Sequence, residues 1–105
     1  MLIGTGWAME IPRGYFGAIF ARSGLASKQG LRPANCVGVV DSDYRGEVKV
    51  ALHNDSLVER RVAAGDRIAQ LVLIPYSQDF LEITFDLDDT ERGEGGFGST
   101  DNKKE

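Results

Sequence analysis

Short runs of β-branched, aromatic and aliphatic residues alternate with turn-forming residues along most of this 105-residue chain. Residues 15–20 are an aromatic and aliphatic run typical of a strand, residues 57–64 are predicted as another strand, and residues 68–74 are almost wholly apolar. Arg13-Gly14 and Gly65-Asp66 are turn sequences between such runs. Turns at about every eight to twelve residues are typical of an all-β sandwich or barrel. We therefore predict an all-β fold in which residues 68–74 are buried on both faces.

Residues 22–30 predict the one helix of the chain. Ser23 is a candidate N-cap, good helix formers follow it, and Gly30 is placed to end the helix after about two turns.

The C-terminal part of the chain differs in composition from the rest. Leu81, Ile83 and Phe85 alternate with polar residues, which predicts a half-exposed strand, but apolar residues become scarce from Asp86 onward. We predict one small β-barrel domain over residues 1–90, followed over residues 91–105 by a flexible glycine-rich tail.

Charge and cysteine content exclude several classes of function. The net charge is −4, from 12 basic and 16 acidic residues, so the chain has no basic surface for nucleic acid. The single Cys36 and single His53 cannot build a disulfide framework or a thiolate–imidazole metal site, and this cysteine usage indicates a cytoplasmic protein. No run of 18 apolar residues is present, so we expect no membrane partner.

Residues 35–50 carry the strongest functional signal. Two β-branched runs, Val37–Val40 and Val48–Val50, flank a polar Asp-Ser-Asp-Tyr-Arg-Gly centre, which predicts a hairpin whose turn carries chemistry. Backbone N–H and C=O groups near the opening of such a hairpin can read the edge of a planar ligand, which favours a nucleobase. Asp41 and Asp43 can equally be turn carboxylates that bond their own backbone.

The segment Gly38–Gly46 closely resembles the third motif of the trimeric dUTP diphosphatases (dUTPases), Gly-x-Ile-Asp-x-x-Tyr-Arg-Gly, with Val for Ile. Three more segments resemble the second, fourth and fifth motifs in the same order: residues 21–26, 65–71 and 92–100. The resemblance implies a dUTPase-like β-barrel or jelly-roll-like sandwich.

The resemblance also implies a reaction and a way of selecting the nucleotide. Asp41 is expected to activate the water that attacks the α-phosphorus of dUTP, releasing pyrophosphate and leaving dUMP. Tyr44 is expected to pack beneath the deoxyribose and reject a 2′-hydroxyl. Asn35, together with backbone groups at Val39 and Val40 and near Lys49, is expected to bind uracil.

The phosphate chain is assigned to a different set of residues. By the same resemblance, Arg22, Ser23 and Gly24 contact the triphosphate and Gln70 has a role in the active site, with Mg²⁺ (magnesium) bound mainly through the triphosphate itself. Two plainer readings stay open: a helix cap with a surface arginine at residues 22–24, and a satisfied buried amide at Gln70.

The tail completes the implied site. Phe97 is expected to stack on uracil while Arg92, Gly98 and Ser99 approach the phosphates, so that the tail closes as a lid over bound nucleotide. In the family this tail covers the site of a neighbouring subunit, which implies a homotrimer. His53 receives no role, since a lone histidine near a strand end is usually a surface residue.

Two alternatives remain open at this point. The family's first motif, an Ala-Gly-Tyr-Asp-like segment, is expected before residue 1, so the chain can also be a truncated, catalytically weak or inactive dUTPase that binds nucleotide or associates with full-length subunits. The second alternative is a dCTP deaminase-like protein; residues 44–46 and 97–99 favour the dUTPase.

Overall fold

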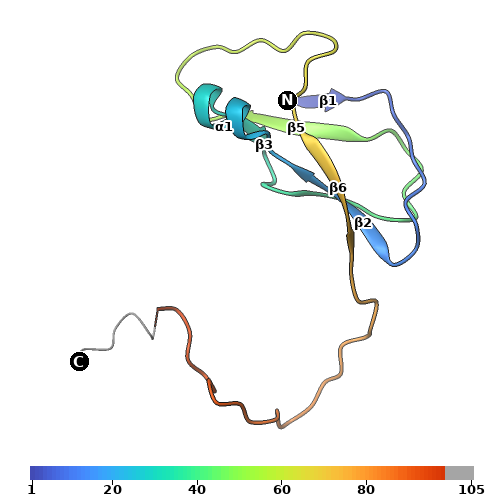
Figure 1. The fold of residues 1–105 in the computed structure, drawn as a ribbon, viewed down its shortest axis with the longest axis vertical. Helices are drawn as coiled ribbons and strands as arrows, with labels where there is room; N and C mark the ends of the chain where they lie inside the picture. Colours follow the sequence, from blue (N-terminus) through green and yellow to red (C-terminus); the bar gives the residue numbers. More distant parts are fainter. Residues whose placement is uncertain (99–105) are drawn as a thin grey trace.

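The computed structural model describes residues 1–98 (Figure 1). This part of the chain folds as strands with a single short helix, in agreement with the predicted all-β class. In chain order the elements are β1 (Leu2–Gly4), β2 (Tyr15–Phe20), α1 (Ser23–Gln29), β3 (Leu31–Pro33), β4 (Gly38–Val40), β5 (Lys49–Asn54) and β6 (Gln70–Pro75).

The strands form two antiparallel sheets of three strands each, in the orders β1-β5-β3 and β4-β2-β6. The central strand β2 spans the predicted run from Tyr15 to Phe20, and it pairs along its full length with β6, from Tyr15 opposite Pro75 to Phe20 opposite Gln70. The other edge of β2 pairs with β4, where Gly17 lies opposite Val40.

Alternating side chains of β5 help to build the core. Val50 and Leu52 are buried, Ala51 between them is half-buried, and Lys49 and His53 on either side are exposed, as expected for a strand with one face inward. The apolar cluster draws on both sheets and on the segments beside them: Ile11, Ile19, Leu31, Val40, Val48, Val50 and Leu52.

The predicted hairpin between residues 37 and 50 is wrong. β4 pairs with β2, and β5 pairs with β1 and β3, so the two strands belong to different sheets. Val40 and Val48 both enter the core, and residues 41–47 cross between the sheets as an irregular loop. The loop is held at both ends by buried side chains, which fixes its position without strand pairing.

Two further strand predictions are wrong. Residues 57–64 are irregular, and residues 81–85 run as extended chain with no strand beside them within residues 1–98. Phe80, Leu81, Ile83 and Phe85 are almost completely exposed. Alternation identifies which side chains could share a face, but a strand also needs a partner edge, and this part of the chain has none.

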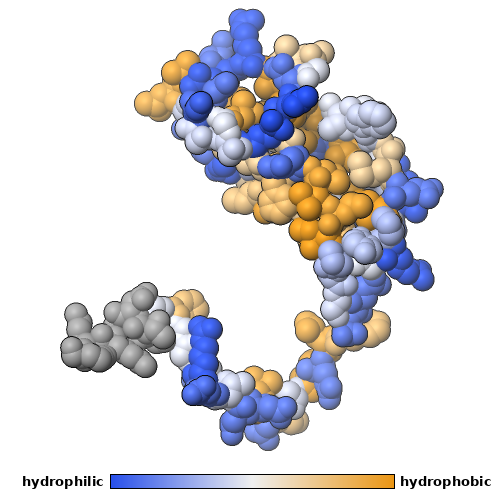
Figure 2. Space-filling model, in the orientation of Figure 1, coloured by the Kyte–Doolittle hydropathy of each residue, from blue (hydrophilic) through white to orange (hydrophobic). Residues whose placement is uncertain are grey.

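The prediction that residues 68–74 are buried on both faces is also wrong. β6 begins only at Gln70 and is the edge strand of its sheet, and Leu71, Val72 and Leu73 are 37%, 44% and 46% exposed. Figure 2 shows an apolar patch on the body near the point where the tail leaves it.

The helix differs from the prediction at one end only. Arg22 occupies the N-cap position with an extended backbone and makes no side-chain cap hydrogen bond, and Ser23 is the first helical residue, so the predicted Ser23 cap is wrong. Gly30 ends the helix as predicted, in the left-handed conformation (φ 71°), and its N–H donates to the carbonyl of Ala26 over 3.1 Å.

After Pro75 the chain has no helix or strand up to residue 98, and Figure 1 shows it leaving the two-sheet body. Over the described residues, no helix is both long and apolar enough to cross a membrane.

An ion pair fastens β3 to the turn after β5. Arg32 Nε lies 2.6 Å from Asp55 Oδ2, and Arg32 Nη2 lies 3.3 Å from Asp55 Oδ1. This hydrogen-bonded guanidinium lowers the pKa of Asp55 from its ordinary value of 3.8. His53 Nε2 also lies 3.2 Å from Asp55 Oδ1.

Replacing Gly30 tests the helix end. A Cβ at Gly30 would lie 3.0 Å from the backbone nitrogen of Ser56, and the left-handed backbone already disfavours a side chain. We expect Gly30→Ala to lower the free energy of unfolding by about 1–2 kcal/mol, measured by urea denaturation. Gly24→Ala is the matched control, because a Cβ there meets no atom within 4 Å and φ is not positive; an equal loss in both variants would contradict this explanation.

Replacing Asp55 tests the ion pair. The folded-state pKa of Asp55 is lowered, so its carboxylate adds stability above pH 3.8, and this contribution is lost as the pH falls through the folded-state pKa. Asp55→Asn should therefore be less stable than the parent protein at neutral pH and equally stable at strongly acidic pH, in urea titrations across pH. Asp88→Asn, in the tail, removes the same formal charge and should leave the pH profile unchanged. A parallel downward shift of the Asp55→Asn profile at every pH would contradict the ion-pair account.

Candidate active site

A cleft of about 220 Å³ lies beside β4 and the loop that follows it. Six residues predicted as nucleoside-binding or catalytic line this base cleft together: Asn35, Val39, Val40, Asp41, Tyr44 and Lys49. They come from the turn before β4, from β4, from the crossing loop and from the start of β5. The structure thus brings this group of predicted site residues into one place.

The backbone of β4 forms one wall of the base cleft. β4 is an edge strand, paired with β2 on one side only among the described residues. An edge strand leaves part of its N–H and C=O groups without ladder partners, and such groups can bind a planar polar ligand. Val39, whose side chain is 62% exposed, lies at the middle of this edge.

Asp41 directly follows β4 and begins the crossing loop. Its backbone carbonyl accepts a hydrogen bond from the Tyr44 N–H over 3.1 Å, which closes a turn, and Arg45 Nη1 donates to the Ser42 carbonyl over 2.8 Å. The Asp41 carboxylate is exposed and accepts no hydrogen bond from residues 1–98. The turn therefore fixes the backbone of Asp41 and leaves its carboxylate free to act as a proton acceptor.

Tyr44 is held by the residues that follow it. Its hydroxyl donates to the carbonyl of Glu47 over 2.6 Å. The ring lies so close to Gly46 that a Cβ on Gly46 would be 2.6 Å from Tyr44 Oη and 2.8 Å from Tyr44 Cζ. Glycine at position 46 is thus required by the space that the tyrosine ring occupies.

Asn35 sits in a tight turn before β4. Its carbonyl accepts from the Val37 N–H over 2.7 Å, and the intervening Cys36 has a positive φ of 65°. Such a conformation is uncommon for a residue with a side chain. The Asn35 side chain is exposed at the rim of the base cleft and makes no hydrogen bond within the described part of the chain.

A second cleft, of about 390 Å³, lies between the start of α1 and the segment that leads into β6. This phosphate cleft, as we call it, is lined by the three residues predicted to bind the triphosphate outside the tail, Arg22, Ser23 and Gly24, and also by Gln70 and Arg67. Gln70 is exposed, and its Nε2 donates to the Ala21 carbonyl over 2.8 Å, so the alternative of a buried amide is wrong.

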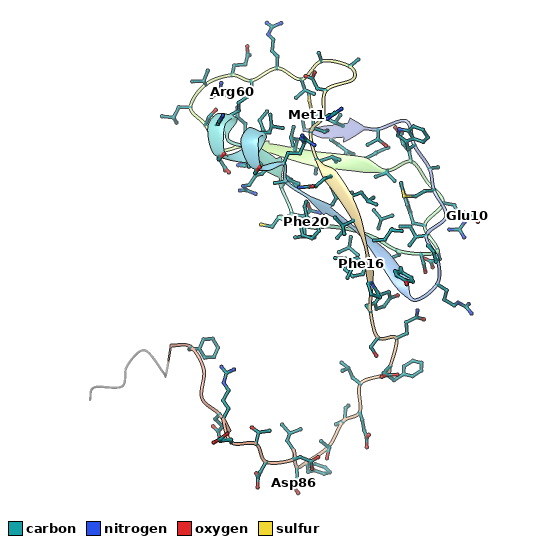
Figure 3. All side chains as sticks on the ribbon, viewed as in Figure 1. Met1, Glu10, Phe16, Phe20, Arg60 and Asp86 are labelled. Atoms are coloured by element: carbon teal, nitrogen blue, oxygen red, sulfur yellow. The ribbon has the colours of Figure 1, made fainter. Side chains whose placement is uncertain are left out.

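Among the described residues of one chain, the base cleft and the phosphate cleft share no lining residue. The predicted tail residues Arg92, Phe97 and Gly98 line neither cleft, and Phe97 is fully exposed. Arg92 instead bonds within its own turn, with its Nε donating to the carbonyl of Gly95. Figure 3 shows the tail at Asp86 well away from Phe20 at the end of β2. Ser99 lies outside the described residues.

Sequence reasoning missed two residues of these clefts. Arg67 lines the phosphate cleft, and its position in the Gly65–Leu71 segment beside Gln70 is a signal that could have been used. Glu47 lines the base cleft, where its carboxylate also accepts from the Gly6 N–H over 2.9 Å, and nothing in its spacing indicated this. In residues 1–98, no group of three or more His, Cys, Asp or Glu side chains is arranged to hold a metal ion.

Comparisons with known proteins point to one family. A model of the dUTPase family matches residues 1–101. The deoxyuridine 5′-triphosphate nucleotidohydrolase of Zymomonas mobilis is 54% identical over 97 residues, which cover 91% of the chain and 66% of that protein. The chain thus spans slightly less than two thirds of this relative's length.

Solved structures give the same result for the fold. A mutant dUTPase of phage 80alpha superposes with a TM-score of 0.82 at 29% identity, covering 94% of the chain and 74% of that protein. A second mutant of the Staphylococcus phage 80alpha enzyme, solved with dUpNHpp, has a TM-score of 0.75 at 26% identity and covers 95% and 79% of the two chains.

The packing of Tyr44 on Gly46 is testable by a double-mutant cycle. We expect Gly46→Ala to displace the ring and to lower the free energy of unfolding by roughly 1–3 kcal/mol, because the added methyl group overlaps the phenol. In a Tyr44→Ala background the same substitution should cost almost nothing, since the clashing atoms are gone. Urea denaturation of the four proteins gives the coupling energy, and a cost of Gly46→Ala that is equal in both backgrounds would show that the ring does not set the requirement for glycine.

Proposed function

The chain belongs to the dUTPase family, and we propose that it hydrolyses dUTP to dUMP and pyrophosphate. The observation that carries this proposal is the base cleft. Six residues line it together, five of them expected to bind the nucleotide and the sixth, Asp41, expected to activate the attacking water with its exposed carboxylate. The relative from Zymomonas mobilis is named for this reaction.

In the proposed reaction Asp41 is the general base. Its carboxylate takes a proton from a water molecule, and the water oxygen attacks the α-phosphorus. The bond between the α-phosphorus and the bridging oxygen to the β-phosphorus then breaks, and pyrophosphate leaves. The free carboxylate on a fixed backbone turn supports this assignment.

Selection of dUTP is proposed to rest on rigid contacts. Tyr44 is restrained by the Glu47 carbonyl and by Gly46, so its ring cannot retreat from a 2′-hydroxyl on the sugar. The open edge of β4 at Val39 and Val40 is proposed to read the uracil ring through backbone polarity, with the Asn35 side chain and the backbone near Lys49 completing the contact.

The triphosphate is proposed to bind in the phosphate cleft. Arg22, Ser23, Gly24 and Gln70 supply a guanidinium, a hydroxyl, an unobstructed backbone and an amide. Mg²⁺ is proposed to bind mainly through phosphate oxygens, where it offsets the substrate charge in a protein of net charge −4.

We further propose a homotrimer in which the tail acts on a neighbouring subunit. Two observations support contact between copies: among residues 1–98 the base and phosphate clefts share no lining residue, and the apolar side chains of residues 80–87 are not covered by that part of their own chain. Residues 1–90 would form the β-barrel domain. Residues 91–105 would form a lid that brings Arg92, Phe97, Gly98 and Ser99 to the nucleotide. The cysteine usage favours the cytoplasm as the place of action.

The test is pyrophosphate release from dUTP with Mg²⁺, with UTP, dCTP and dTTP as controls. We expect release from dUTP alone, and we expect Asp41→Asn to lower kcat by roughly 10²–10⁴-fold, because the amide keeps the size of the side chain and loses its basicity. Affinity for dUpNHpp should be retained in this variant.

Three outcomes would contradict parts of the proposal. If Asp41→Asn kept a turnover close to that of the parent protein, Asp41 would not be the general base. Micromolar dUTP binding by the parent chain with negligible pyrophosphate release would identify a binding protein. Formation of dUTP from dCTP would identify a deaminase.

A further inference from the structure

Arg67 and Arg22 lie past the same end of one antiparallel ladder. Phe20 pairs with Gln70 as the last step between β2 and β6. The chain continues from Phe20 toward Arg22, and it arrives at Gln70 from Arg67. Because the two strands run in opposite directions, both arginines emerge at this end, and both line the phosphate cleft.

Hydrogen bonds fix the backbone beneath each arginine. Gln70 Nε2 donates to the carbonyl of Ala21, directly before Arg22. On the other side, Asp66 Oδ2 accepts from the Ala63 N–H over 2.8 Å, and the Asp66 N–H donates to the Ala63 carbonyl over 3.0 Å, which closes the turn that presents Arg67. The carboxylate adjacent to Arg67 in sequence is therefore engaged by the turn and makes no ion pair with Arg67.

The phosphate cleft is positively charged in an acidic protein. Its lining includes Arg22 and Arg67 and no Asp or Glu residue. Within residues 1–98 neither arginine forms an ion pair or a side-chain hydrogen bond, whereas Arg32 binds Asp55, and Arg45 and Arg60 donate to backbone carbonyls. Two guanidinium groups that line one cleft with no acidic residue in its described lining form a site for an anion with several oxygens.

We propose that Arg67 is a substrate-binding residue that, together with Arg22, binds the phosphate chain of the nucleotide. This inference rests on the proposed function for the identity of the nucleotide, but the anion site itself does not depend on hydrolysis. Each guanidinium offers a planar fork of N–H donors to phosphate oxygens, so two of them can hold a polyphosphate chain at two points along its length.

The experiment compares Arg67→Gln with the matched control Arg13→Gln. Both residues are exposed, and both substitutions remove one positive charge, but Arg13 precedes the other end of β2 and does not line the phosphate cleft. Inorganic tripolyphosphate serves as the probe for the phosphate cleft, by calorimetric titration of the whole chain. Deoxyuridine, which carries no phosphate, serves as the probe for the base cleft, by NMR titration.

We expect Arg67→Gln to weaken tripolyphosphate binding by about tenfold or more, because it removes charge-assisted hydrogen bonds. Arg13→Gln should change it by less than about twofold at physiological salt, because Arg13 lies at the other end of the β2–β6 ladder, where its charge is screened. Arg67→Lys, which keeps the charge but loses the planar fork, should fall between the parent and Arg67→Gln. Deoxyuridine affinity should be the same in all four proteins, which also shows that the variants are folded.

The inference is overturned if the parent chain does not bind tripolyphosphate, if Arg67→Gln binds it as the parent does, or if Arg13→Gln loses as much affinity as Arg67→Gln. Failure of the proposed function has a different signature, namely no pyrophosphate release from dUTP by a chain whose tripolyphosphate binding still depends on Arg67.

Discussion

The crossing loop at residues 41–47 depends on two buried valines, one on each side of it. Val40 closes β4 in one sheet and Val48 precedes β5 in the other, and both are anchored in the same apolar cluster. Burial of such side chains is worth roughly 1.5–3 kcal/mol each, more than the single hydrogen bonds within the loop contribute. The core therefore decides where the loop lies, and the turn at Asp41 and the Tyr44–Glu47 bond only refine it. A polar loop held in this way can expose a carboxylate without losing its position.

Local features of the fold were predictable from sequence, and pairing partners were not. The strand at residues 15–20, the helix end at Gly30 and the turn at Gly65 follow from residue types whose backbone preferences are strong. The hairpin at residues 37–50 and the strand at residues 81–85 failed for a common reason. A period of two shows which side chains share a face, but the partner of a strand is chosen by packing between residues far apart in the chain. β4, which ends at Val40, and β5, which follows Val48, pair in different sheets, and both valines still pack in one apolar cluster because both sheets contribute to it.

The candidate site, like the fold, was predictable from the sequence only in part. Asn35 and Lys49 meet Asp41 at the base cleft because their segments lie side by side in the fold, and no regular spacing links the three positions. Only the likeness to a family pointed to them in advance. Arg67 was missed although it lies in the segment that resembles the fourth motif, because its place beside Arg22 at the phosphate cleft follows only from the pairing of β2 with β6. Strand pairing, which the sequence does not give, was the deciding information.

Residues 80–87 are extended chain with exposed apolar side chains, and two opposing free-energy terms explain why they form no strand within residues 1–98. Burying Phe80, Leu81, Ile83, Phe85 and Leu87 would contribute roughly 1.5–3 kcal/mol each. Fixing the backbone costs about 1–2 kcal/mol per residue, so over this segment the two effects nearly cancel. Backbone hydrogen bonds to a strand edge then decide whether the segment orders, and an edge on another copy could supply them. Under the proposed trimer, the contact that orders this segment would also carry Arg92 and Phe97 toward a neighbouring base cleft, so assembly and completion of the active site would be the same event.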